Sequence, residues 1–269
     1  AGAPPLLPLL FVTIACGAIS GFHGLVGSGT TSKQLDLETD ARFVGYLGST
    51  GEGALALAAI IATTAGFASL EEWRAIYTNF EGGGLAAFVQ GGATIVSDGS
   101  GLSHETAATL LTVMAVLFAG TTMDTGVRLQ RYIVQEWGTI YGISSLRSSY
   151  VATFVAVAAC LTLAFGAGGA DLTGGMVLWP LFGTTNQLLA SLTLLVISIV
   201  LVRAGRPARY TMVPMVFVST AALLAALYQL WAFFQSAQYL LLVLDAVIVI
   251  SAVFVMLEAI AAFGRRTSA

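Results

Sequence analysis

The chain has 269 residues, of which 57% are hydrophobic and 9% are charged, and its formal net charge at pH 7 is -3. Soluble domains carry roughly 25% charged residues, so this composition excludes a soluble protein and identifies an integral membrane protein. The mean hydropathy is +0.88, and the apolar runs are continuous rather than alternating. These features predict an all-α fold, a polytopic transmembrane helix bundle in the lipid bilayer with no nucleic-acid partner.

Seven segments have the roughly 20 apolar residues that a helix needs to cross the hydrocarbon core. They are expected at 6–31, 43–67, 104–128, 148–167, 176–202, 211–234 and 240–263. The outer connection 68–103 contains a short interfacial helix around Trp73 and Tyr77. Its apolar, glycine-rich part from 82 to 96 is too short to span and is expected to fold back over the protein as a lid or re-entrant piece, the alternative being a packed loop without a gating role. Residues 1–269 are thus predicted to form a single transmembrane domain.

The basic residues predict the orientation of the chain. If the first span begins outside, every Lys and Arg except Arg74 falls on the inner side. Short cytoplasmic loops carry an excess of Lys and Arg. The sequence therefore predicts a multi-pass protein whose C-terminus is cytoplasmic.

The first span is interrupted by five glycines between Gly17 and Gly29. Glycine weakens a helix by roughly 1 kcal/mol relative to alanine. In lipid, backbone that leaves helical geometry must be buried in protein or face a water-filled cavity. Such a span predicts a transporter binding site, and the alternative is close helix packing through Gly17 and Gly21. The candidate substrate-binding residues are Ser20, Gly21, Phe22, His23, Gly24 and Ser28.

His23 lies in the middle of this run. Histidine titrates near neutral pH, so His23 is expected either to carry a proton or to pair with a carboxylate substrate. The alternative is a neutral ring that makes one hydrogen bond. The only other histidine, His104, lies at the predicted outer surface, so a haem held by two histidines across helices is not favoured.

A polar cluster in the third span is the candidate site of ion or proton coupling. Its members are Thr121, Thr122, Asp124 and Thr125. Hydroxyl and carboxylate oxygens are hard ligands of the kind that hold a cation or relay a proton. The alternative is that Asp124 pairs with Arg128, which follows it by one helical turn.

The fifth span is also predicted to be interrupted, because Pro180 removes a backbone donor and Gly183 loosens the next turn. Asn186 and Gln187 follow directly. Their amides are expected either to contact the substrate or to join neighbouring helices.

Three further carboxyl groups fall in apolar spans. Glu52, between two glycines in the second span, is expected to be buried, to be approached closely by another helix and to carry a coupled proton. Asp245 and Glu258 are expected to lie toward the ends of the last span and to reach the membrane surface, without a functional role.

These polar stretches strongly resemble the carbon starvation protein A (CstA) family. The matching letters are ISGFH at 19–23, SGTTSK at 28–33, DARFVGY at 40–46, TTMDT at 121–125 with RLQRY at 128–132, and LWPLFGTTNQLLA at 178–190. The resemblance implies a secondary active transporter of the inner cell membrane and not an enzyme. Members of the family import peptides or pyruvate, the latter with protons, under nutrient starvation.

The resemblance also implies a fold related to the LeuT-type (APC superfamily) transporters, which consist of two inverted five-helix repeats. This chain resembles the second repeat plus two extra helices. Family members are far longer, so we expect a missing N-terminal half or a partner subunit to supply the first repeat. The partners implied are a small carboxylate or short peptide and a proton or sodium ion, with no cofactor. The alternatives are a membrane sensor of the same fold that has lost transport and, less favoured, a membrane electron carrier.

Overall fold

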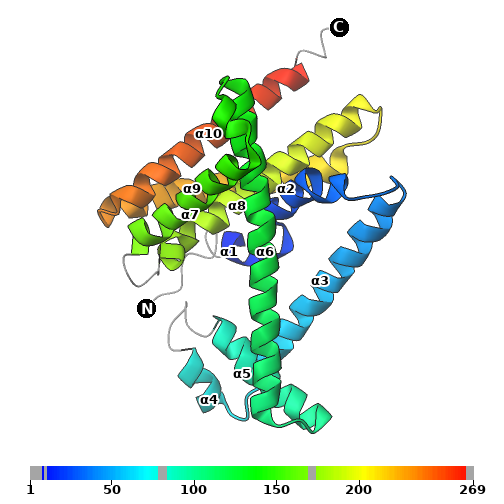
Figure 1. Ribbon diagram of the computed structural model, residues 1–269, viewed down its shortest axis with the longest axis vertical. Helices are drawn as coiled ribbons and strands as arrows, with labels where there is room; N and C mark the ends of the chain where they lie inside the picture. The colour runs from blue at the N-terminus through cyan, green and yellow to red at the C-terminus, as the bar shows by residue number, and fades with distance from the viewer. Residues whose placement is uncertain (1–7, 9–10, 78–83, 169–173, 265–269) are drawn as a thin grey trace. The chain divides into compact units, whose positions relative to one another are not determined.

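The computed structural model describes residue 8 and residues 11–77, 84–168 and 174–264 (Figure 1). Every regular element in these ranges is a helix, which confirms the all-α prediction. Within the same ranges, seven helical segments are long and apolar enough to span a membrane, the number predicted from the sequence. They are Phe11–Lys33, Asp40–Ala65, His104–Ile140, Ser149–Gly166, Val177–Arg203, Arg209–Gln235 and Tyr239–Leu257.

The chain divides into two compact units, and each is described here by itself. Among the described residues, the first unit contains 32–77 and 84–128, and the second contains 8, 11–31, 129–168 and 174–264. The single transmembrane domain expected from the sequence stays a prediction.

The first unit is built on the packing of α3 (Asp40–Ala65) against α5 (Gly84–Ser100). A short helix, α4 (Leu70–Ile76), lies between them in the sequence, and its Trp73 donates a hydrogen bond from Nε1 to the carbonyl of Thr63 at 3.0 Å. The described part of the glycine-rich stretch 82–96 belongs to α5. The alternative of a packed loop was wrong, because this part is helical and packs on α3, while its role as a lid or re-entrant piece stays a prediction.

The glycines of α5 explain this packing. A Cβ atom built on Gly91 would collide with the backbone of Ala62 on α3, and one built on Gly66 would collide with the backbone of Gly91. Gly91 and Gly92 are buried where α5 meets Ala62 of α3. The sequence therefore forms a helix whose smallest residues allow two backbones to approach closely.

The third span is much longer than predicted. Helix α6 (His104–Ile140) continues past the expected end at 128, and at 1.5 Å per residue its 37 residues extend about 55 Å. Arg128 and Arg131 end the apolar run, but arginine is a good helix former, so the charges do not end the helix. Leu129 and Val134 are buried in the second unit.

The second unit is organised around α8 (Gly174–Arg203). This helix packs against the helices α1 (Phe11–Ala18), α2 (Gly21–Gly29), α7 (Ser149–Gly168), α9 (Arg209–Gln235) and α10 (Tyr239–Gly264), as Figure 1 shows. Two short 3-10 turns, Thr31–Lys33 and Ser144–Arg147, complete the described elements. The centre of the unit is therefore α8, and its neighbours meet different faces of it.

Helix α8 is continuous through Pro180 and Gly183, so the predicted interruption of the fifth span was wrong. Pro180 is the seventh residue of α8, so the helix lacks one hydrogen bond to the carbonyl four residues earlier but continues past it. Its own carbonyl accepts a hydrogen bond from Nε2 of Gln229 on α9 at 2.8 Å. The neighbouring helix thus holds this turn in place.

Candidate functional site

The first span is broken, as its glycine content predicted. Helix α1 ends at Ala18 and α2 begins at Gly21, so Ile19 and Ser20 lie outside helical geometry. Ser20 is extended, with φ -104° and ψ 124°. A break of this kind removes helical partners from the last carbonyls of one helix and the first N–H groups of the next. These backbone groups must find other partners or bind a ligand.

Two amide side chains of α8 supply several of those partners. Oδ1 of Asn186 accepts hydrogen bonds from the backbone N–H of Phe22 at 2.9 Å and from Oγ of Ser20 at 3.3 Å. Nε2 of Gln187 donates to the carbonyl oxygen of Ile19 at 2.8 Å. The structure therefore brings four predicted site residues together, although 164 or more positions separate the bonded residues in the sequence.

The amides of α8 are enclosed at this break. Asn186 and Gln187 are both buried, and Nδ2 of Asn186 lies 3.0 Å from Sγ of Cys16 on α1. The helix-joining interpretation of these two residues is confirmed by their hydrogen bonds. Oε1 of Gln187 is buried without a hydrogen-bond partner among the described residues. Gln187 thus also presents an unused acceptor beside the broken backbone.

Close packing of the first span runs through Gly21 and Gly24, not through the predicted pair of Gly17 and Gly21. A Cβ atom on Gly21 would collide with the backbone of Asn186 and Ala190 on α8. One on Gly24 would collide with the side chain of Thr193, while Gly17 has open space around it among the described residues. The expected alternatives therefore coexist, because the break and the close contact occur at the same glycine.

His23 and Ser28 lie on α2 beyond the enclosed part of the break, and both are exposed. Oγ of Ser28 donates to the carbonyl of Gly24 at 2.9 Å. Neither is among the residues that Asn186 and Gln187 hold at the break. Their contact with a substrate stays a prediction.

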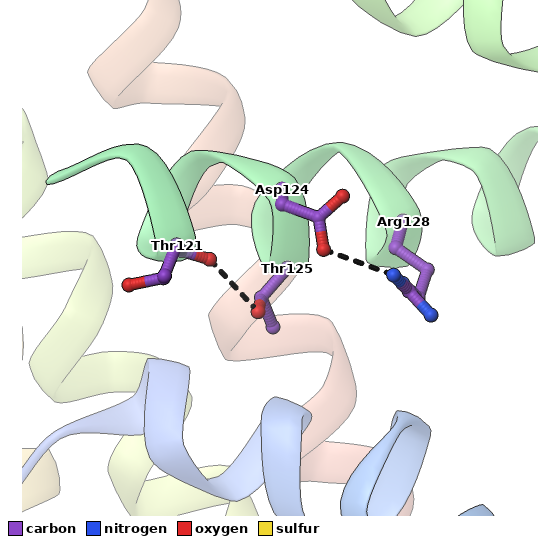
Figure 2. Close-up of polar contacts among 4 residues, drawn as sticks. All are labelled: Thr121, Asp124, Thr125 and Arg128. Atoms are coloured by element: carbon purple, nitrogen blue, oxygen red, sulfur yellow. Dashed lines mark hydrogen bonds and ion pairs between the residues drawn. The ribbon is translucent and has the colours of Figure 1, made fainter. Parts of the chain in front are cut away.

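The polar cluster of the third span lies on α6, within the first unit (Figure 2). Nη2 of Arg128 and Oδ2 of Asp124 are 2.9 Å apart, so the ion pair considered as the alternative is present. The hydroxyls of Thr121 and Thr122 donate to the carbonyl of Phe118 at 3.0 and 2.9 Å, and that of Thr125 donates to the carbonyl of Thr121 at 3.1 Å. The hydroxyl oxygens keep lone pairs for a cation.

The Asp124–Arg128 pair is weakly held. The Asp124 side chain is 69% exposed, and exposed pairs one turn apart on a helix contribute only about 0.3–0.5 kcal/mol. Such a pair opens and closes easily. The coupling role of this cluster stays a prediction.

Glu52 lies on α3 in the first unit, and its side chain is exposed rather than buried. Within the first unit no other element approaches the flanking Gly51 and Gly53, since a Cβ built on either glycine has no neighbouring atom within 4 Å beyond the adjacent residues and backbone of α3. The role of Glu52 as a proton carrier also stays a prediction.

The largest departure from the sequence interpretation is Asp245. It was expected to reach the membrane surface, yet it is 0% exposed on α10, and neither carboxyl oxygen has a hydrogen-bond partner in the described part of the chain. The spacing along α10 could have predicted this burial. Leu241, Ile248 and Ala252 lie on the same helix face as Asp245 and belong to or pack against the buried apolar clusters. The side chain of Glu258 lies outside the described residues.

Comparison with known proteins identifies the family of the chain. The model of the family described as carbon starvation protein CstA matches residues 1–76 and 72–225. The chain belongs to this family. The CstA match includes the broken first span, the α6 cluster and the amides of α8, while the last helix lies beyond it.

Several curated proteins are similar to this CstA-family chain. The peptide transporter CstA of Helicobacter pylori strain J99 is 34% identical over 76% of the chain, and that of Escherichia coli K12 is 31% identical over 78%. The pyruvate/proton symporter BtsT of Escherichia coli K12 is 30% identical over 75%. The matches cover 36%, 37% and 37% of these proteins, so the chain spans little more than a third of their length. No solved structure matches the chain significantly.

Proposed function

We propose that this chain forms part of a secondary active transporter that imports peptides or pyruvate together with protons. The observation that carries the proposal is the broken first span, whose backbone is held by two buried amides from α8 in a protein of the CstA family. The names of the relatives support it, because they are peptide transporters and a pyruvate/proton symporter. We propose no enzymatic activity.

The substrate group recognised at the break is a carboxylate, which pyruvate and peptides share. The N–H of Phe22 lies in the first turn of α2, where the helix dipole favours negative charge. A bound carboxylate takes the place of Oδ1 of Asn186 as acceptor for that N–H and for the hydroxyl of Ser20. His23 and Ser28 contribute further polar contacts along α2.

Gln187 gives the same site a way to distinguish the two substrates. Its Oε1 is buried without a hydrogen-bond partner in the described residues, and a peptide has N–H groups that can donate to it. Pyruvate has no N–H group. A buried acceptor that one substrate satisfies and the other leaves unpaired favours the first.

Coupling involves the α6 cluster of Thr121, Thr122, Asp124 and Thr125, together with Glu52. The exposed ion pair of Asp124 opens at little cost, so a proton or a sodium ion can exchange for Arg128 as the partner of the carboxylate. Further polypeptide or a partner subunit completes the transport path, as in a LeuT-type pair of repeats. The protein lies in the inner cell membrane with its C-terminus in the cytoplasm and acts under nutrient starvation.

Uptake in cells tests this proposal. Cells without their own carriers express the gene that encodes this chain, and labelled pyruvate and a labelled dipeptide are supplied with and without a proton uncoupler. We expect uptake of at least one substrate that collapses with the uncoupler. The absence of uptake of both, with the protein present in the membrane, contradicts transport and favours a sensor of the same fold.

A further inference from the structure

Three buried polar side chains occupy one level of the packed helices α8, α9 and α10. They are Thr184, Gln229 and Asp245, which are 1%, 7% and 0% exposed. An apolar cluster bounds the level on one side and consists of Leu181, Phe233 and Leu241. A second bounds it on the other side and includes Leu188, Ala222 and Ala252. Because residues three, four or seven positions apart share a helix face, one polar residue per helix falls between the clusters.

Two members of this polar level are hydrogen-bonded to each other. Oγ1 of Thr184 donates to Oε1 of Gln229 at 2.6 Å, and Nε2 of Gln229 donates to the carbonyl of Pro180 at 2.8 Å. The carboxyl group of Asp245 has no such bond, and both of its oxygens are buried. It is therefore the one member of the level for which the described residues supply no partner.

Within the described residues of α8, α9 and α10, no basic side chain bonds to Asp245. Along α8 and α9 the only charged residues are Arg203, the last of α8, and Arg209, the first of α9. The titratable phenols of α9 and α10 are Tyr210, Tyr228 and Tyr239, which are 71%, 39% and 68% exposed. The only other acidic residue of α10 is Glu258, more than three turns away along the helix. An ionised carboxylate without a partner is strongly disfavoured in such surroundings.

A bound proton removes that cost. It neutralises the carboxyl group, which then needs no opposite charge among the helices that enclose it. Asp245 lies about 9 Å along α10 from its first residue, so it is inside the span and not at its edge. Ionisable groups in that position commonly lie on proton or substrate paths.

We propose that Asp245 is a further proton-carrying carboxyl of this transporter, an inference that rests on the proposed function. Its carboxylate takes one proton from water on one side, holds it while α8, α9 and α10 enclose it, and gives it to water on the other side. No other bond forms or breaks. Asp245 lies beyond the residues that the CstA family model matches.

Helix α8 connects this carboxyl group to the substrate site. Thr184 is on the same helix as Asn186 and Gln187, which hold the broken first span. A shift of α8 on substrate release therefore disturbs both the break and the level that encloses Asp245. This shared helix gives the two sites a physical means of coupling.

The test compares Asp245→Asn with unmodified protein expressed from the gene that encodes the chain. Uncoupler-sensitive uptake of labelled substrate is expected to fall roughly 100-fold, the low end of the contribution of a positioned proton-transferring group. Exchange of labelled for unlabelled substrate, which needs no net proton movement, is expected to continue near the normal rate. Asp245→Glu retains a carboxyl group and restores part of the uptake. Asp98→Asn, at an exposed residue of α5, is the matched control and keeps full uptake.

The outcomes separate this inference from the proposed function. If the unmodified protein shows no uncoupler-sensitive uptake, the proposed function fails. If that uptake is present and survives in Asp245→Asn, or if exchange is lost together with uptake in folded protein, only the inference fails. If Asp245→Asn does not reach the membrane, a hydrophobic carbodiimide is applied to unmodified protein during turnover. Modification of Asp245 in proportion to lost uptake supports the inference, and modification without loss or no modification overturns it.

Discussion

The contact between α2 and α8 predicts that Gly21→Ala is strongly destabilising. The new Cβ atom would collide with the backbone oxygen of Asn186 and the backbone nitrogen of Ala190. Backbone atoms in the middle of α8 cannot rotate away as the end of a side chain can. Either α2 must move off α8 or the α1–α2 break must change shape.

The size of this effect follows from the packing. Forcing an extra carbon into a well-packed contact costs about 1–3 kcal/mol. At Gly17 the same substitution meets open space among the described residues and gains up to about 1 kcal/mol in helix stability. Gly24→Ala meets only the side chain of Thr193, which can adopt another rotamer, so its cost is smaller.

The assay is the melting temperature of the purified protein in detergent, followed by size-exclusion chromatography of heated samples. We expect Gly17→Ala to melt at a higher temperature than the unmodified protein and Gly24→Ala to melt at a lower one. Gly21→Ala is expected to melt several degrees below Gly24→Ala. Thr193→Ala is expected to reverse the loss in Gly24→Ala and to leave the loss in Gly21→Ala. Uptake is expected to fall in the same order, since the break carries the proposed substrate site.

One result would refute this reasoning. If Gly21→Ala melts at the same temperature as Gly17→Ala, the backbone of α2 does not approach α8 as described. Equal melting temperatures together with lost uptake would instead place the importance of Gly21 in substrate binding alone.

Three further predictions concern single side chains. Asn186→Ala leaves the N–H of Phe22 without its acceptor and is expected to lower the stability by about 1–3 kcal/mol, measured by thermal melting. Thr185→Ala is the control and should change stability little, because the Thr185 hydroxyl donates to the carbonyl of Leu181 within α8. Asp124→Asn removes an exposed ion pair and should alter stability by at most about 0.5 kcal/mol, so a large loss of uptake would report coupling and unchanged uptake would exclude it. Gln187→Met removes a buried acceptor and should lower the rate of dipeptide uptake relative to pyruvate uptake, and an unchanged ratio in a competition assay would contradict its role in selectivity.

The number of spans could be predicted because hydropathy depends only on length and composition. The ends of the spans could not be predicted in this way, because hydropathy detects where an apolar run stops and not where a helix stops. Arg128 and Arg131 show the difference, since α6 continues through both of them. The helical form of α5 was not predicted for a related reason. Its glycines weaken a helix, and the packing against α3 that stabilises it cannot be read from the sequence.

The broken first span was predictable from its glycines, but its partners were not. The sequence marks Ser20 and Asn186 as polar residues in apolar spans, and only tertiary packing reveals that one holds the other. The same limit applies to Asp245. Its position along the span suggested the membrane surface, whereas the face of α10 that it shares with Leu241 determines its burial.

The contact of Cys16 with Asn186 provides the chain with an intrinsic chemical reporter. The chain has two cysteines, of which Cys160 is exposed and Cys16 is half-buried beside the break. In a Cys160→Ser background, a maleimide can therefore react within this chain only at Cys16. Its rate of alkylation would then follow the opening of the break in real time, and substrates that close it could be ranked by how well they protect the thiol.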